Sequence, residues 1–229
     1  MNNQKVIKRL FDIAFASFVL FITSPLILLG ALTVKLTSPG QAFYKAKRAG
    51  LAGKPFYMFK LRTMFVNTDT PNQKITEEGD SRITPMGRIL RKLKIDEFPQ
   101  FWNVLIGEMS IVGPIRPIEW DLVDKYFTPK QRLTLENIFQ IRPGIVCPAD
   151  LEWYPDLTYH DPPSGNVSIQ EWYLQRHLPV QLTEGIRYLE LQSLLLDLKV
   201  IAKTIFCLLV YSWFPPKKQP PTFEQQELA

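Results

Sequence analysis

The sequence predicts an α+β fold that is mainly helical, in which a small domain with a β-hairpin follows an amino-terminal re-entrant membrane helix. Three observations carry this prediction: a long apolar run near the amino terminus, a glycine-containing turn between two aromatic-rich segments, and repeated Thr-Pro helix-start signals. The 229 residues are 46% apolar and 21% charged, a composition typical of a globular chain that buries a core of its own.

The first element is an apolar segment over residues 10–34, whose one charged residue is Asp12. At 1.5 Å per residue it is long enough to cross a bilayer. Pro25 lies near its middle and predicts a break, where the Ser24 hydroxyl can serve a freed backbone group. Basic residues flank both ends, so the positive-inside rule places both ends in the cytoplasm. A re-entrant helix satisfies both observations, and a simple bitopic anchor is the alternative.

The next elements are a hairpin and three helices. The hairpin is predicted over 43–60, with two glycines in its turn. Thr-Pro pairs supply the N-cap and first turn of two helices, expected at 84–94 and 128–139. A third helix, which begins at a proline and ends at a glycine, is expected between them at 99–107.

Two segments follow in the carboxyl-terminal third. Residues 148–168 hold four prolines and are predicted to form a surface loop. Residues 189–214 are apolar but include Asp197, Lys199 and Lys203, whose charges are costly at the centre of a bilayer. They are expected to form an amphipathic helix lying in the membrane interface or packed on the domain, with an ordinary core helix as the alternative.

Residue counts limit the partners. Two cysteines and two histidines are too few for a disulfide scaffold or a zinc cluster, so a metal here would be held by carboxylates, as Mg²⁺ is. The first 60 residues hold nine Lys or Arg and one acid, against 18 bases and 21 acids in the remainder. Because this basic segment encloses the most apolar run, its expected partner is an anionic membrane lipid surface, and no nucleic-acid partner is expected.

The chemically interesting pair is Asp96-Glu97, between the helices expected at 84–94 and 99–107. A helix start there would offer free N–H groups and a favourable dipole to a phosphate. Adjacent carboxylates diverge on a helix, so they suit two roles, one attacking and one holding a cation. Four basic residues precede the pair within nine positions, which suits phosphoryl transfer to a carboxylate nucleophile. Taken alone, an Asp-Glu pair is more commonly a solvated helix end.

Several short motifs follow one another in a fixed order: 60–64 (KLRTM), 95–100 (IDEFPQ), 103–114 (NVLIGEMSIVGP) and 142–145 (RPGI), with Lys8-Arg9-x-x-Asp12, Ser24-Pro25 and Ser193-Leu194-x-x-Asp197 outside them. This succession resembles the bacterial sugar transferases of the monotopic phosphoglycosyl transferase type. The resemblance covers about residues 5–205. The chain departs from the family pattern at an inserted Ile115 and at Val146-Cys147.

The resemblance implies transfer of a sugar 1-phosphate from a UDP-sugar to polyprenol phosphate, with release of UMP and a requirement for Mg²⁺. It implies that Asp96 is the nucleophile of a covalent phosphosugar intermediate and that Glu97, together with Asp96, holds the metal. The substrate-binding residues that it implies are Lys60, Arg62, Arg88, Arg91, Arg116 and Arg142. A surface ion pair is the alternative for each arginine.

The predicted organisation has three parts: a re-entrant membrane helix with basic flanks at 1–40, a cytoplasmic catalytic domain with interfacial amphipathic helices at 41–205, and an apolar, then Pro-rich and polar tail at 206–229. The protein is expected on the cytoplasmic face of the bacterial inner (plasma) membrane as a monotopic enzyme. The sequence neither requires nor excludes a homo-oligomer. A non-catalytic, membrane-anchored interaction module of a glycan-assembly complex is the alternative function.

Overall fold

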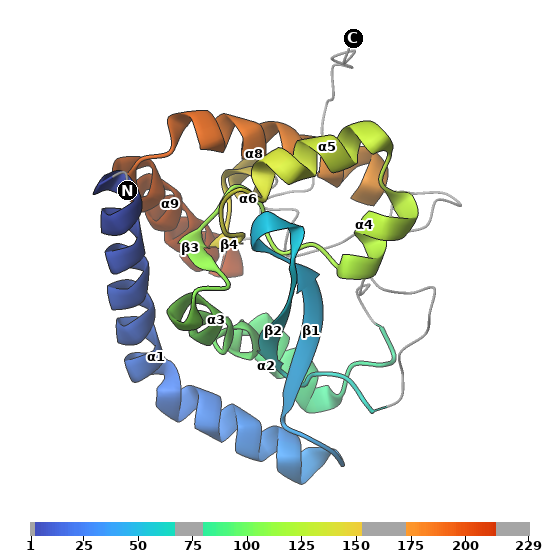
Figure 1. Ribbon diagram of the computed structural model, residues 1–229. Helices are drawn as coiled ribbons and strands as arrows, with labels where there is room; N and C mark the ends of the chain where they lie inside the picture. Colours follow the sequence, from blue (N-terminus) through green and yellow to red (C-terminus); the bar gives the residue numbers. More distant parts are fainter. Residues whose placement is uncertain (1–2, 67–79, 153–172, 214–229) are drawn as a thin grey trace.

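The computed structural model describes residues 3–66, 80–152 and 173–213, and in them the fold is mainly helical with two small sheets (Figure 1). The expected α+β class is confirmed. The elements are α1 (Asn3–Thr37), β1 (Phe43–Ala49), η1 (Leu51–Gly53), β2 (Pro55–Leu61), α2 (Pro85–Lys92), η2 (Ile95–Glu97), α3 (Gln100–Ile106), β3 (Ser110–Val112), α4 (Trp120–Tyr126), α5 (Pro129–Ile138), β4 (Gly144–Val146), α6 (Pro148–Glu152), η4 (Tyr173–His177), α8 (Leu178–Leu191) and α9 (Leu194–Trp213).

Helix α1 continues through Pro25 and changes direction along its length (Figure 1). Pro25 has no N–H for the Phe21 carbonyl, and the Ser24 hydroxyl donates to that same carbonyl at 2.9 Å. The expected interruption is therefore a bend within one continuous helix, because the serine replaces the lost hydrogen bond.

The apolar surface of α1 is mostly uncovered, with Phe21 81% exposed and Leu36 77% exposed. Within the described ranges, α1 is the one helix long and apolar enough to cross a membrane. A core helix of a soluble protein would bury this surface, so the exposure indicates membrane association. The inner side of α1 packs on the domain, where Gly30 approaches Leu61 and Leu90 closely.

The hairpin and the predicted helices are present. β1 pairs with β2 in antiparallel register, Phe43 opposite Leu61 and Ala49 opposite Pro55. Helices α2 and α5 both begin after a threonine whose hydroxyl accepts a backbone N–H, from Gly87 at 2.9 Å and from Gln131 at 3.3 Å. Helix α3 ends at Gly107, whose φ of 89° lies in the left-handed region.

The sequence did not predict a parallel pair between β3 and β4, in which Ser110 lies opposite Gly144 and Val112 opposite Val146. Gly113 and Gly144 lie in direct backbone contact beside this pair, where a Cβ on either would overlap the other. The pair therefore brings the segment after β3 next to the segment after β4.

Three buried clusters form the core. The first lies between α1, the hairpin, α3, β3 and α9, the second between α4, α5, α8 and the end of β1, and a small third one between α1, β2 and α2. Tyr188 and Ile115 are among the largest fully buried side chains. The inserted Ile115 thus serves as a core residue of the second cluster.

The carboxyl-terminal predictions need correction. Residues 148–152 form helix α6, because Pro148 is tolerated in a first helical turn, and the rest of the predicted loop, 153–168, lies outside the described residues. The apolar run over 189–214 is divided between the end of α8 and α9. Ser193 accounts for this division, since its hydroxyl accepts the N–H of Leu196 at 3.2 Å at the start of α9. Helix α9 passes through residue 205, where the catalytic region was expected to end.

A buried charged cluster joins α1 to α9, and α9 lies beside the amino-terminal part of α1 (Figure 1). Lys8 Nζ lies 3.1 Å from Asp12 Oδ1 and 2.9 Å from Asp197 Oδ2. Asp12 also accepts the Ser110 hydroxyl at 2.8 Å, and Tyr188 donates to Asp197 at 2.6 Å. The two terminal motifs of the sequence therefore serve the fold together, by fixing α9 on α1 and β3.

Candidate active site

The Asp96-Glu97 pair lies in η2, a single turn between α2 and α3. Helix α2 stops because Lys94 adopts the left-handed conformation, with a φ of 56°. This conformation is unfavourable for a residue with a Cβ, and such strain is typical of functional sites. The turn places both carboxylates between the end of α2 and the end of β2.

Asn103 fixes η2 and α3 against the hairpin. The side chain is fully buried, accepts the Phe59 N–H at 3.0 Å and donates to the Tyr57 carbonyl at 2.8 Å. These bonds occupy the outer edge of β2, so Lys60 at the end of this strand faces η2. The amide thereby positions Lys60 for contact with Glu97.

Both carboxylate oxygens of Glu97 are held by cations. Oε1 accepts from Lys60 Nζ at 3.1 Å and Oε2 accepts from Arg116 Nη2 at 3.2 Å. Burial opposes ionisation of Glu97, but the charges of Lys60 and Arg116 outweigh it and hold the pKa of this carboxyl well below its ordinary value. Glu97 is therefore ionised, and both of its carboxylate oxygens are bound to cationic side chains.

Asp96 has the opposite environment. The residue is 6% exposed, and its Oδ1 atom has no hydrogen-bond partner among the described residues. Burial, and then the neighbouring Glu97 charge, raise the pKa of Asp96, while the charges of Lys60, Arg91 and Lys94 oppose that rise. The pair thus divides into one carboxylate held by two cations and one with an unused oxygen.

Arg91 and Arg116 extend this charged region. Arg91 Nε donates to the Thr63 hydroxyl at 2.8 Å, and its charge acts on Asp96. Arg116 interacts with Asp150 as well as with Glu97, and these two carboxylates raise its pKa against the effect of burial. The cationic groups near the pair are therefore Lys60, Arg91, Lys94 and Arg116.

The other predicted binding residues lie elsewhere. Arg62 is 9% exposed and donates to the carbonyls of Pro39 and Ser38, at 2.6 and 2.9 Å, so it holds the connection between α1 and β1. Arg142 donates to the Gly107 carbonyl at 2.5 Å, at the carboxyl end of α3. Arg88 is exposed on α2.

The start of α3 does not offer its N–H groups to a phosphate as expected. The N–H groups of Phe98, Phe101 and Trp102 donate to carbonyls three residues earlier, at 3.3, 3.1 and 3.0 Å. The continuous run of turns from η2 into α3 consumes these donors. A phosphate bound here would therefore be held by the cationic side chains.

Sequence reasoning missed Asp150. It is 6% exposed, its Oδ2 accepts the Cys147 N–H at 2.9 Å, and its Oδ1 has no hydrogen-bond partner among the described residues. Burial raises the pKa of Asp150, while Arg116 lowers it. The Cys-Pro-x-Asp order, an N-cap followed by Pro at N1, was the local signal for this short helix start.

The residues present fit a hard divalent cation. Asp96 offers an unpartnered carboxylate oxygen next to Glu97. The described residues contain no cluster of three or more His, Cys, Asp or Glu that could hold a metal by themselves. A protein site of this kind suits Mg²⁺, which commonly takes one or two carboxylates and completes its shell with water and substrate phosphates.

The sequence matches a family model and several known proteins. Residues 3–211 match the family model described as bacterial sugar transferase. A UDP-glucose:undecaprenyl-phosphate glucose-1-phosphate transferase of Caulobacter vibrioides is 37% identical over 202 residues, which cover 88% of this chain and 69% of that protein.

Two further relatives differ in length. An uncharacterised sugar transferase of Bacillus subtilis, EpsL, is 37% identical over 90% of this chain and 88% of its own length. A UDP-N-acetylgalactosamine-undecaprenyl-phosphate N-acetylgalactosaminephosphotransferase of Aeromonas hydrophila is 39% identical over 61% of this chain, but that match spans 32% of the Aeromonas protein. The range matched by the family model, residues 3–211, includes the apolar helix α1 and the region around Asp96.

Proposed function

Because the chain belongs to the bacterial sugar transferase family, it is a phosphoglycosyl transferase, and we propose that it transfers a sugar 1-phosphate from a UDP-sugar to polyprenol phosphate through an aspartyl intermediate. The observation that carries the proposal is the unequal pair in η2. Glu97 has both oxygens bound to cations, whereas buried Asp96 keeps one oxygen without a partner. The unused oxygen makes Asp96 the nucleophile.

In the first step, a carboxylate oxygen of Asp96 attacks the sugar-bearing phosphorus of the UDP-sugar. The bond from this phosphorus to the bridging oxygen breaks, and the oxygen and its electron pair leave with UMP. In the second step, a phosphate oxygen of polyprenol phosphate attacks the same phosphorus and releases the Asp96 carboxylate. The products are UMP and polyprenyl-diphosphate-sugar, and no redox partner is needed.

The cations divide the work of charge stabilisation. Lys60 and Arg116 are anchored on Glu97, so they can face the substrate phosphates from fixed positions, while Arg91 is held by Thr63. Mg²⁺ held by Asp96, Glu97 or both would neutralise phosphate charge. Burial favours the neutral form of Asp96, and the three cations acting on it oppose that effect, so they help keep the nucleophile ionised.

The proposal places the domain on the cytoplasmic side of the membrane, where nucleotide sugars are found. The bend in α1 and the basic residues on both of its flanks support a helix that enters and leaves on that side. Each half of the helix is too short to cross the hydrocarbon core of roughly 30 Å alone.

The test is intact-mass analysis of the purified protein after incubation with a UDP-sugar and Mg²⁺, without acceptor. The wild type should gain one sugar phosphate, and Asp96→Asn should gain none. UMP release with undecaprenyl phosphate should fall by about 10³-fold or more in Asp96→Asn. The substitution should leave the melting temperature unchanged or higher, because it removes a buried charge.

Thr63→Val is the matched control, since it removes only the anchor of Arg91 and should slow turnover without abolishing the adduct. Appreciable turnover by Asp96→Asn would overturn the covalent mechanism. Absence of UMP release by the wild type with every UDP-sugar offered would instead support the non-catalytic interaction module.

A further inference from the structure

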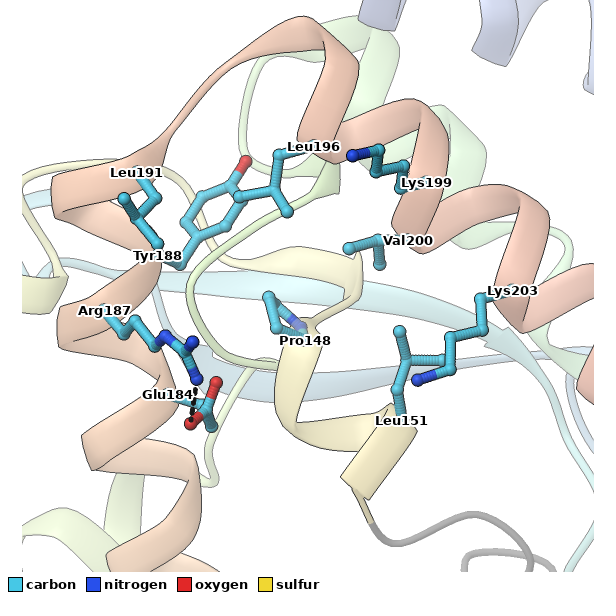
Figure 2. Close-up of a pocket in the computed structure, with 10 residues that line it drawn as sticks. All are labelled: Pro148, Leu151, Glu184, Arg187, Tyr188, Leu191, Leu196, Lys199, Val200 and Lys203. Atoms are coloured by element: carbon cyan, nitrogen blue, oxygen red, sulfur yellow. Dashed lines mark ion pairs between the residues drawn. The ribbon is translucent and has the colours of Figure 1, made fainter.

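A cavity of about 260 Å³ lies between α6, α8 and α9 (Figure 2). Its lining is apolar at the floor, where Pro148, Tyr188 and Val200 meet, and basic at the rim, which carries Arg187, Lys199 and Lys203. Asp96, Glu97, Lys60 and Arg116 are not among the ten residues that line it. The cavity is therefore distinct from the carboxylate site.

The rim carries an excess of positive charge. Its one acid, Glu184, lies 3.6 Å from Arg187 on the same helix. Lys199 and Lys203 are exposed, stand one turn apart on α9 and have no carboxylate partner among the described residues. Figure 2 shows both lysine side chains extending from α9 toward the cavity. Two like charges one turn apart repel each other, so an anion between them is favoured.

The lysines lie at the border of an uncovered apolar face. Five large apolar residues of α9 are between 45% and 63% exposed. These residues are Leu195, Leu198, Ile205, Phe206 and Leu209. At 100° per residue they share one face of the helix, and Lys199 and Lys203 follow between that face and the buried face. Leu191, which is 57% exposed, continues the apolar surface on the α8 side of the cavity.

This arrangement is typical of a helix lying in a membrane interface, with its apolar face among acyl chains and its lysines at the level of the lipid phosphates. We propose that the cavity between α6, α8 and α9 binds the headgroup phosphate of an anionic phospholipid. Lys199, Lys203 and Arg187 meet the phosphate, and the exposed face of α9 contacts the acyl chains. The volume lies just below the usual range for small-molecule sites, which suits a headgroup rather than a whole lipid.

The apolar rim distinguishes this ligand from a soluble anion, because a free phosphate or nucleotide would leave that surface in water. The lining, which shares no residue with the carboxylate site, distinguishes this ligand from the acceptor lipid of the reaction. The inference goes beyond the proposed function and rests only on membrane association.

The test is native mass spectrometry of the full chain in detergent, titrated with phosphatidylglycerol or phosphatidylcholine. The wild type should retain phosphatidylglycerol in preference to phosphatidylcholine. Lys199→Gln/Lys203→Gln should weaken phosphatidylglycerol binding by roughly 30-fold, since each lysine near an anionic lipid surface contributes a factor of about five. Each single variant should weaken phosphatidylglycerol binding by a factor of about five, so the proposal can still be tested if the double variant is poorly folded.

Lys125→Gln/Lys130→Gln is the matched control, because it removes two exposed lysines from α4 and α5, outside the cavity, and should bind like the wild type. Unchanged phosphatidylglycerol binding by the α9 variants would overturn the proposal. So would equal binding of glycerol 1-phosphate, which indicates a site for free phosphate, or lysine-dependent retention of undecaprenyl phosphate alone, which indicates the acceptor site.

Discussion

Replacing Lys8 by methionine tests how helices α1 and α9 are held together. The Lys8 ammonium is the shared partner of Asp12 and Asp197, at 3.1 and 2.9 Å, and Asp197 is fully buried. Methionine preserves the length and helix propensity of the side chain but leaves two buried carboxylates without their cation. Removing one partner of a buried ion pair costs about 3–5 kcal/mol.

For a chain of this size, each kcal/mol corresponds to roughly 2–4 °C in melting temperature, so Lys8→Met should melt about 6–20 °C below the wild type. The assay is thermal unfolding followed by circular dichroism in one detergent at one pH. Lys5→Met is the matched control, because Lys5 is exposed on the same helix, and its change should stay within about 0.5 kcal/mol.

A second substitution separates the charge effect from lost packing. Asp197→Asn removes one of the two orphaned charges while keeping an oxygen that can accept the Tyr188 hydroxyl. Lys8→Met/Asp197→Asn should therefore recover about 2 kcal/mol of the loss. A melting temperature of Lys8→Met equal to that of Lys5→Met, or a double variant no more stable than Lys8→Met, would refute the reasoning.

Three further predictions address the site and the topology. EDTA should abolish UMP release and Mg²⁺ should restore it, and an active Glu97→Gln variant with unchanged Mg²⁺ dependence would move the metal to other ligands. Arg142→Ala should lower the free energy of unfolding by about 1–2 kcal/mol, because the Arg142 guanidinium binds the Gly107 carbonyl, and should leave the KM for the UDP-sugar unchanged. Arg116→Ala should raise that KM. Steady-state kinetics of both variants check this, and a raised KM in Arg142→Ala with an unchanged KM in Arg116→Ala would contradict the assignment. In a cysteine-free background, cysteines introduced at Asn3 and Gln41 should both resist an impermeant thiol reagent in intact cells and both react after lysis, and labelling at either position from outside would show that the chain crosses the membrane.

Elements whose sequence signals are local could be predicted from the sequence. The threonine caps before α2 and α5, the glycine that ends α3 and the glycines in the hairpin turn each act within a few residues, so the sequence placed these elements close to where they are found. The Ser24-Pro25 step is equally local, and the Ser24 hydroxyl has the predicted role. The Asp-Glu pair could be singled out because Arg91 and Lys94, whose charges act on Asp96, are also close to it in sequence.

Contacts between side chains that are distant in sequence could not be predicted and depend on the packing of the whole fold. Lys60 reaches Glu97, while Arg62, two residues later, turns to Ser38, because the strand ends between them. Asp150 comes to Arg116 through the parallel pairing of β3 with β4. Lys8 and Asp197 meet because α1 and α9 both pack on β3. Such contacts depend on long-range packing, which has no periodicity in the sequence from which it could be predicted.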